Sequence, residues 1–179
     1  MESWWEAGLR RVKERVWCYH ILCILVCAVI AWAGTAGAMP LKKLAKSFGT
    51  PAAVFCGVCL FYYVFREIFV KLKKGQVAMA AVVDSLLKSA LKVLRLAHPL
   101  VGILAFYLVL LHGTLMVAAD VSLRTSRMVF GLAAGAAMLC LLMTGGRLTK
   151  SKQFRQYHRL LAFAGVIFFL LHLYVKFKF

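Results

Sequence analysis

Acidic residues are scarce in this chain. Six Asp and Glu stand against 23 Lys and Arg over 179 residues, which leaves a formal net charge of +17. Within the long apolar stretches, Glu67 is the only carboxylate. Because intramembrane Asp and Glu commonly form the proton relays of transporters, their scarcity counts against a proton-coupled carrier.

The chain also lacks a polar stretch long enough to form a soluble domain. Hydrophobic residues make up 63% of it, compared with roughly half in soluble proteins. A window of about 20 residues, the length that crosses the bilayer core, finds five candidate transmembrane helices. They cover residues 17–39, 50–71, 96–119, 127–146 and 157–177. We therefore expect one domain over residues 1–179, an all-α membrane protein built as a bundle of five transmembrane helices.

Proline is rare, with three residues in all. Pro40 is expected to end the first helix, because the residue before a proline avoids helical backbone angles. Thr50 and Pro51 are expected to cap and begin the second helix. The first span also has the pattern of a signal peptide that would end near residues 36–38. We expect a retained helix, and cleavage would not change the orientation of the rest.

Basic residues lie in the short segments between the apolar runs. Nucleic-acid-binding proteins gather such residues on one face or in a tail, so no nucleic acid partner is expected. Sixteen Lys and Arg precede the first span or lie in the second and fourth connections, and seven lie on the other side. By the positive-inside rule, the chain is then a multi-pass inner-membrane protein surrounded by lipid, with its N-terminus in the cytoplasm and its C-terminus outside.

Residues 76–95 are not apolar enough to span a membrane, but their apolar residues repeat at helical spacing. The opposite face carries Lys88, Lys92 and Arg95. The apolar face consists of Val82, Val83, Leu86, Leu87, Ala90, Val93 and Leu94. This pattern predicts one interfacial amphipathic helix on the cytoplasmic surface. It would serve as a plain connector or, as the alternative, as a docking site for a partner.

The six cysteines all lie inside or at the ends of the predicted spans. Free Cys behaves there as a small apolar residue, so no disulfide framework is expected. Cys56 and Cys59 have C-x-x-C spacing, but Leu60 follows where a c-type haem attachment would need His. Packing in the core is the preferred interpretation of this pair.

Four of the five histidines lie on two predicted helices with the same spacing. His98 and His112 are 14 residues apart, as are His158 and His172. Fourteen residues advance about 1400° around a helix, about 40° short of four turns, so each pair projects from nearly one face. The rise between the members of a pair is about 21 Å, which is most of the hydrocarbon thickness.

Because one span separates the third helix from the fifth, these two helices must run parallel. His98 then lies at the depth of His158 on the cytoplasmic side, and His112 at the depth of His172 on the outer side. Each level offers two facing imidazoles, which suit a haem b iron with one axial ligand above and one below. Zinc or copper normally takes three or four protein ligands, and no third ligand is expected at either depth.

Residues around the four histidines agree with two bis-histidine haems. Ala105 and Gly165 stand midway between the histidines of their helices, where small side chains leave room for a bulky cofactor. Arg155 and Arg159 are candidate cofactor-binding residues, because haem propionates need cationic partners. Further candidates are Lys152 and Arg95 on the cytoplasmic side and Arg124, Arg127 and Lys176 outside. His20 has no partner at this spacing and is expected at the membrane interface.

Two parts of the chain resemble the ferric reductase-like transmembrane domain. They are Arg155-Gln-Tyr-His158-Arg-Leu-Leu-Ala-Phe followed by Leu-Leu-His172-Leu, and His98-Pro-Leu-Val-Gly-Ile-Leu-Ala followed by Leu-Leu-His112. That family includes the membrane cores of ferric reductases and NADPH oxidases, and the haem-binding subunit of a bacterial periplasmic methionine sulfoxide reductase system. The resemblance covers mainly residues 95–179. It implies axial haem ligation by the two histidine pairs and electron passage from a cytoplasmic or membrane donor to an outer acceptor.

Ferric reductases and NADPH oxidases continue into flavin- and nucleotide-binding domains. This chain ends at Phe179 and has no G-x-G-x-x-G motif. We therefore expect the haem subunit alone, an electron-transfer subunit of an oxidoreductase. Its donor would be quinol or a cytoplasmic protein, and its acceptor ferric iron or a periplasmic or extracellular redox partner.

Two alternatives stay open. The chain could be a quinone-linked membrane anchor of a redox complex, with a quinone pocket near Tyr62, Tyr63, Arg66 and Glu67. From another class, it could be a haem-free transporter or assembly subunit whose histidines relay protons or metal ions.

Overall fold

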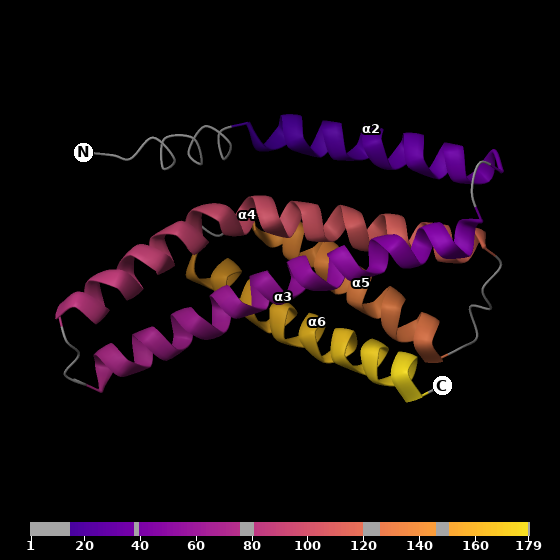
Figure 1. Ribbon diagram of the computed structural model, residues 1–179. Helices are drawn as coiled ribbons and strands as arrows, with labels where there is room; N and C mark the ends of the chain where they lie inside the picture. The colour runs from indigo at the N-terminus through magenta and orange to yellow at the C-terminus, as the bar shows by residue number, and fades with distance from the viewer. Residues whose placement is uncertain (1–14, 38–39, 76–80, 120–125, 146–150, 179) are drawn as a thin grey trace.

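Five long helices make up the computed structural model. It describes residues 15–37, 40–75, 81–119, 126–145 and 151–178, and within these ranges it contains no strand. The helices are α2 (Val16–Thr35), α3 (Leu41–Lys74), α4 (Ala81–Ala118), α5 (Ser126–Gly145) and α6 (Lys152–Lys178) (Figure 1). Each is long and apolar enough to cross a membrane. The prediction of an all-α chain with five candidate spans is therefore confirmed.

Small parts of the predicted segments lie outside the described residues. These parts are residues 38–39 of the first span, residues 76–80 of the amphipathic segment and residue 146 of the fourth span. Arg124 also lies outside them.

The start of α3 differs from the prediction. The helix begins at Leu41, directly after Pro40, and Pro51 lies inside it. The prediction that Thr50 and Pro51 begin this helix was therefore wrong. Pro51 removes one backbone hydrogen bond, but the preceding turns pack on α4, where fully buried Ala45 contacts Leu111 and Leu115. This packing keeps the backbone helical through the proline.

The amphipathic segment and the third span form one helix. Residues 81–95 run without interruption into the apolar part of α4, which has 38 residues. Figure 1 shows that α4 is bent, with its first part inclined to the rest. Pro99 lies inside α4, and an interior proline is a common cause of a kink.

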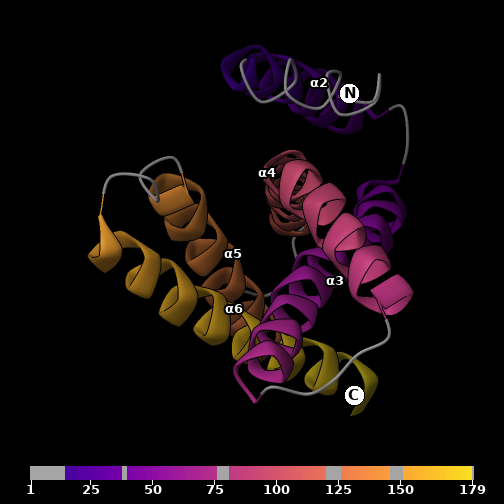
Figure 2. The same cartoon turned by 90° about the vertical axis from the view of Figure 1, so that its left-hand side faces the viewer.

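The helices pack as two hairpins with α4 at the centre. α3 packs along α4, α5 packs along α6, and α4 also contacts α5 and α2. Figure 2 shows α5 and α6 beside the α3–α4 pair, with α2 lying apart over α4. The contact between the hairpins includes Ile103 and Phe106 of α4 with Met138 and Leu142 of α5. Most other large apolar side chains face outward, as expected where lipid replaces water.

A polar contact attaches α2 to α4. Nδ1 of His20 lies 3.1 Å from the hydroxyl oxygen of Tyr107, and the two rings meet edge to face. The thiol of Cys27 also approaches the Tyr107 carbonyl, at 3.8 Å. Tyr107 is buried, so His20 turns toward the bundle and packs against it. All six cysteines are free.

Replacing Tyr107 with Phe removes the hydroxyl but keeps the aromatic packing. Since a hydrogen bond contributes roughly 0.5–1.5 kcal/mol, we expect α2 to open more often in Tyr107→Phe. Amide hydrogen exchange should then be faster in Val16–Thr35 and unchanged in α5 and α6. Tyr174→Phe, at an exposed ring, is the matched control. Equal exchange of α2 in wild type and Tyr107→Phe would show that this bond does not hold the helix.

Candidate functional site

The four histidines of interest lie on two helices, His98 and His112 on α4 and His158 and His172 on α6. α4 and α6 run in the same direction (Figure 1). His98 lies near the middle of α4, and His158 lies near the beginning of α6. His112 and His172 lie four turns further along. We call the level of His98 and His158 the inner level, after its expected side of the membrane, and the other the outer level.

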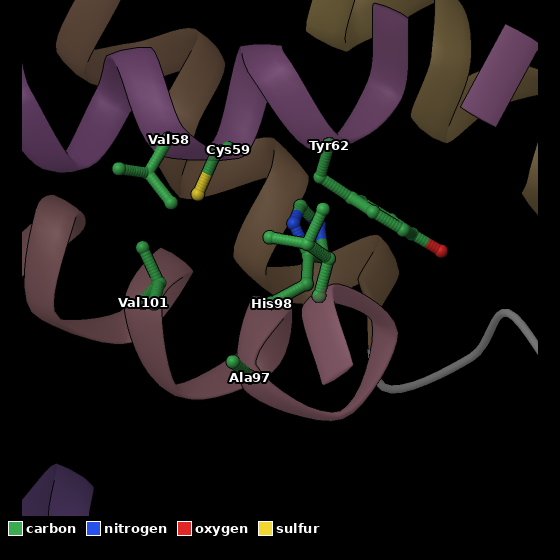
Figure 3. Close-up of a pocket in the computed structure, with 7 residues that line it drawn as sticks. Val58, Cys59, Tyr62, Ala97, His98 and Val101 are labelled. Carbon is green, nitrogen blue, oxygen red and sulfur yellow. The ribbon is translucent and has the colours of Figure 1, made fainter. Parts of the chain in front are cut away.

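At the inner level, His98 lies between α4 and α3. Its ring centroid is 4.9 Å from that of Tyr62, and both residues line a small pocket together with Cys59 (Figure 3). The other lining residues are Val58, Leu94, Ala97 and Val101. Nδ1 of His98 is buried and has no hydrogen-bond partner. Burying a ring nitrogen without a hydrogen bond is unfavourable, and Nδ1 of His98 is such an atom.

The second inner ring, His158, is paired with α5. Its Nδ1 lies 3.1 Å from Oγ1 of Thr144. The Thr144 hydroxyl has its own acceptor one turn back, the carbonyl of Cys140 at 2.8 Å. Its proton is therefore engaged, and the hydroxyl oxygen accepts from Nδ1–H of His158. This arrangement leaves the lone pair on Nε2 of His158.

At the outer level, His112 has the same tautomer for a different reason. Its Nδ1 lies 2.8 Å from the backbone carbonyl oxygen of Ala45 on α3. A carbonyl can only accept, so Nδ1 carries the proton and Nε2 keeps its lone pair. Ligating histidines typically donate their other ring N–H to a carbonyl, carboxylate or water. His112 has this arrangement, and His158 has a side-chain hydroxyl as the acceptor in its place.

Each outer histidine lies against a glycine of its own hairpin. A Cβ added to Gly49 would be 3.1 Å from Cε1 of His112, and one added to Gly131 would be 3.1 Å from Nδ1 of His172. Both distances are shorter than ordinary van der Waals contact, so a methyl group would displace the imidazole. In each hairpin, a glycine on one helix therefore leaves room for the imidazole of the other helix.

The donor sets fit a bis-imidazole haem better than a tetrahedral metal. Among the described residues, no three His, Cys, Asp or Glu side chains come together, whereas zinc sites normally need three or four protein ligands. α4 packs on α3 and α5, and α6 packs on α5. A haem ligated from both faces holds its two helices apart, and such helices cannot pack at the usual 8–10 Å.

The small residues between the levels do not face a shared space. Ala105 is fully buried. Gly165 lies against α5, where an added Cβ would be 3.5 Å from that of Ala137. By contrast, a Cβ added to Gly102, one turn after His98, would meet no atom within 4 Å. Open space beside the inner level is therefore found at Gly102.

The two predicted arginines lie at the inner end of α6. Arg155 and Arg159 are both exposed. Nη2 of Arg159 lies 3.9 Å from Oε1 of Glu67 on α3, and Nη1 of Arg66 lies 2.9 Å from the same oxygen. The contact of Arg159 with Glu67 joins the two hairpins, whereas Arg66 and Glu67 are neighbours on α3. A role toward haem propionates stays a prediction for both arginines.

Several residues at the site were not found from the sequence. Neither Gly131 nor Gly49 was identified as a neighbour of an outer histidine. Thr144 ends an apolar helix with no signal except its position 14 residues before His158. The Ala45 carbonyl belongs to the backbone, so the residue type does not indicate that it accepts a hydrogen bond from His112.

No protein-family model, curated protein or solved structure matches this chain. Its function is therefore inferred from the arrangement of the histidines.

The glycine contacts can be tested with two alanine substitutions on α3. Ala in a helix interior is more favourable than Gly by roughly 0.5–1 kcal/mol. Gly57 has no atom within 4 Å of an added Cβ, so Gly57→Ala should raise or maintain the thermal unfolding midpoint in detergent. Gly49→Ala should give a lower midpoint than Gly57→Ala, because its methyl group meets His112. Equal midpoints would mean that His112 is not held against Gly49.

Proposed function

We propose that this protein is a di-haem b-type cytochrome of the ferric reductase-like kind that moves electrons across the cytoplasmic membrane. His98 with His158 would bind the inner haem, and His112 with His172 the outer haem. Electrons would enter from a quinol or a cytoplasmic protein. They would leave to an outer acceptor, either ferric iron or a periplasmic or extracellular redox partner.

One observation carries this proposal. At each level, one histidine donates Nδ1–H to a fixed acceptor on the neighbouring helix and so keeps Nε2 free to bind iron: His158 to Thr144 and His112 to Ala45. A histidine kept only for helix packing has no need for the same tautomer at both depths. The approximately 21 Å rise between the levels suits two sites in series across a bilayer.

Haem, when bound, supplies the one-electron chemistry, and the protein supplies ligation, orientation and an apolar surrounding. His98 and His158 would hold the inner group, with Tyr62 packed on one ligand ring. Arg159 and Arg155 lie at this end of α6 and would compensate propionate charge. At the outer level, Gly49 and Gly131 leave the ligand rings the room they need.

The proposed topology follows from charge and from the described part of the amphipathic segment. Val82, Val83 and Leu86 are exposed and apolar, whereas Lys88 carries charge nearby. We place residues 81–95 at the cytoplasmic surface of the inner membrane, with apolar residues toward lipid. The N-terminus would then be cytoplasmic and the C-terminus outside.

Absorption spectroscopy tests the proposal directly. The purified protein, expressed with sufficient haem, should give a reduced-minus-oxidised spectrum with Soret and α bands. The pyridine haemochrome assay should find two haems b per chain. Absence of both bands would refute the cytochrome and favour the haem-free transporter or assembly subunit.

Single substitutions test the pairing of the histidines. His112→Ala should remove only the outer haem and leave one haem per chain, because His98 and His158 are untouched. His20→Ala is the control and should retain both haems, since His20 pairs with Tyr107. Loss of the inner haem in His112→Ala, with the outer haem retained, would show that the proposed pairing is wrong.

A quinone-linked anchor is the second candidate, and one observation favours it. The Tyr62 ring packs on His98, and the ion pairs of Glu67 with Arg66 and Arg159 lie just beyond it along α3. If quinol binds there, a water-soluble quinol should reduce the haem rapidly. Tyr62→Phe should slow this reduction, whereas Tyr63→Phe should not. Equal rates in both variants would argue against a quinol site at Tyr62.

A further inference from the structure

Within the residues that the structure describes, Thr144 is the only side chain that hydrogen-bonds to a histidine ring of the inner level. Nδ1 of His158 meets Thr144 at 3.1 Å, while Nδ1 of His98 is buried without a partner. The two inner rings therefore differ in polar support. The difference lies on α5, a helix that contributes no histidine.

The Thr144 hydroxyl is restricted in the part it can play. Its oxygen lies 2.8 Å from the Cys140 carbonyl and 3.1 Å from that of Leu141. Both carbonyls are acceptors, so they take the single hydroxyl proton. The remaining lone pair can only accept, and Nδ1–H of His158 is the donor that reaches it. Gly145 follows directly, and a Cβ added there would lie 3.8 Å from Cε1 of His158, so the ring rests against the end of α5.

We propose that Thr144 is the positioning residue of the inner site, whose hydroxyl fixes His158 in the Nδ1–H tautomer with Nε2 directed to the iron. The haem-dependent part of this inference rests on the proposed function. Hydrogen bonding at Nδ1–H makes the ring a stronger electron donor through Nε2. A stronger donor stabilises ferric iron and lowers the reduction potential of that haem.

A competing acceptor is present on the same helix. The backbone carbonyl of Leu141 lies 3.1 Å from Oγ1 of Thr144, the same atom that meets Nδ1 of His158. If this carbonyl alone fixed the tautomer, removal of the Thr144 hydroxyl would change nothing. The two possibilities therefore give different results for a threonine-to-valine substitution, which preserves the shape of the side chain.

The variants are Thr144→Val, which removes the acceptor, and Thr144→Ser, which keeps it. Thr114→Val is the matched control, because the Thr114 hydroxyl makes the same one-turn bond to a backbone carbonyl, at 2.8 Å from Leu110, and is exposed. The measurement is a redox titration of the full-length protein that resolves the two haems. Retention of the outer haem reports that each variant is folded.

We expect Thr144→Val to shift the inner haem to a more positive potential and to leave the outer haem unchanged. Thr144→Ser should restore the wild-type potential, and Thr114→Val should have no effect. A merely structural role of Thr144 would not give a shift confined to one haem and rescued by a hydroxyl. An inner potential that is unchanged in Thr144→Val would overturn the proposal.

A second readout needs no haem. In the haem-free protein with ¹⁵N-labelled histidine, His158 should give the nitrogen shifts of the Nδ1–H tautomer. In Thr144→Val it should move toward the Nε2–H form or a mixture. If wild type binds no haem but this shift is seen, the cytochrome proposal fails and the role of Thr144 stands. If the tautomer is the same in both proteins, the role of Thr144 fails whatever the haem content.

Discussion

The arrangement of this molecule depends on one constraint: an imidazole placed among apolar helices has two ring nitrogens, and each needs a partner. In both hairpins the neighbouring antiparallel helix gives the first partner or the space for the ring. α3 supplies a carbonyl and a glycine to His112, and α5 supplies a hydroxyl to His158 and a glycine to His172. In the proposed function, the second nitrogen is the one that would bind the haem iron.

α4 is the central helix of the molecule, and it packs less closely with α6 than with α3 or α5. α4 contacts α2, α3 and α5, and polar side chains on different faces of α4 meet different helices. Tyr107 faces α2 through His20, whereas His98 and His112 face α3. Because lipid supplies no hydrogen bonds, polar side chains on several faces of a helix depend on partners within the protein. Tyr107 and His112 have such partners, whereas Nδ1 of His98 has none.

Much of this was predictable from the sequence, for physical reasons. Span positions follow from hydropathy. The two histidine levels, which helical geometry and the number of spans between the helices predict, stay a prediction. The start of α3 was not predictable, because burial of Ala45 against Leu111 and Leu115 outweighs the usual effect of Pro51. The support of the ligand rings was not predictable either. It depends on the register of two antiparallel helices, which places Gly49 beside His112. That register cannot be predicted from the identity of either residue.

The lengths of α3 and α4 have a consequence for the environment of the protein. At 1.5 Å per residue, their 34 and 38 residues extend about 51 and 57 Å, well beyond a hydrocarbon core of about 30 Å. Upright helices of this length place several turns in the headgroup region or in water. There Asp84 bridges α3 and α4 by pairing with Lys73 and Lys88, at 2.7 Å each. This end of the hairpin therefore senses ionic strength and bilayer thickness, while the two histidine levels remain in a medium that excludes both influences.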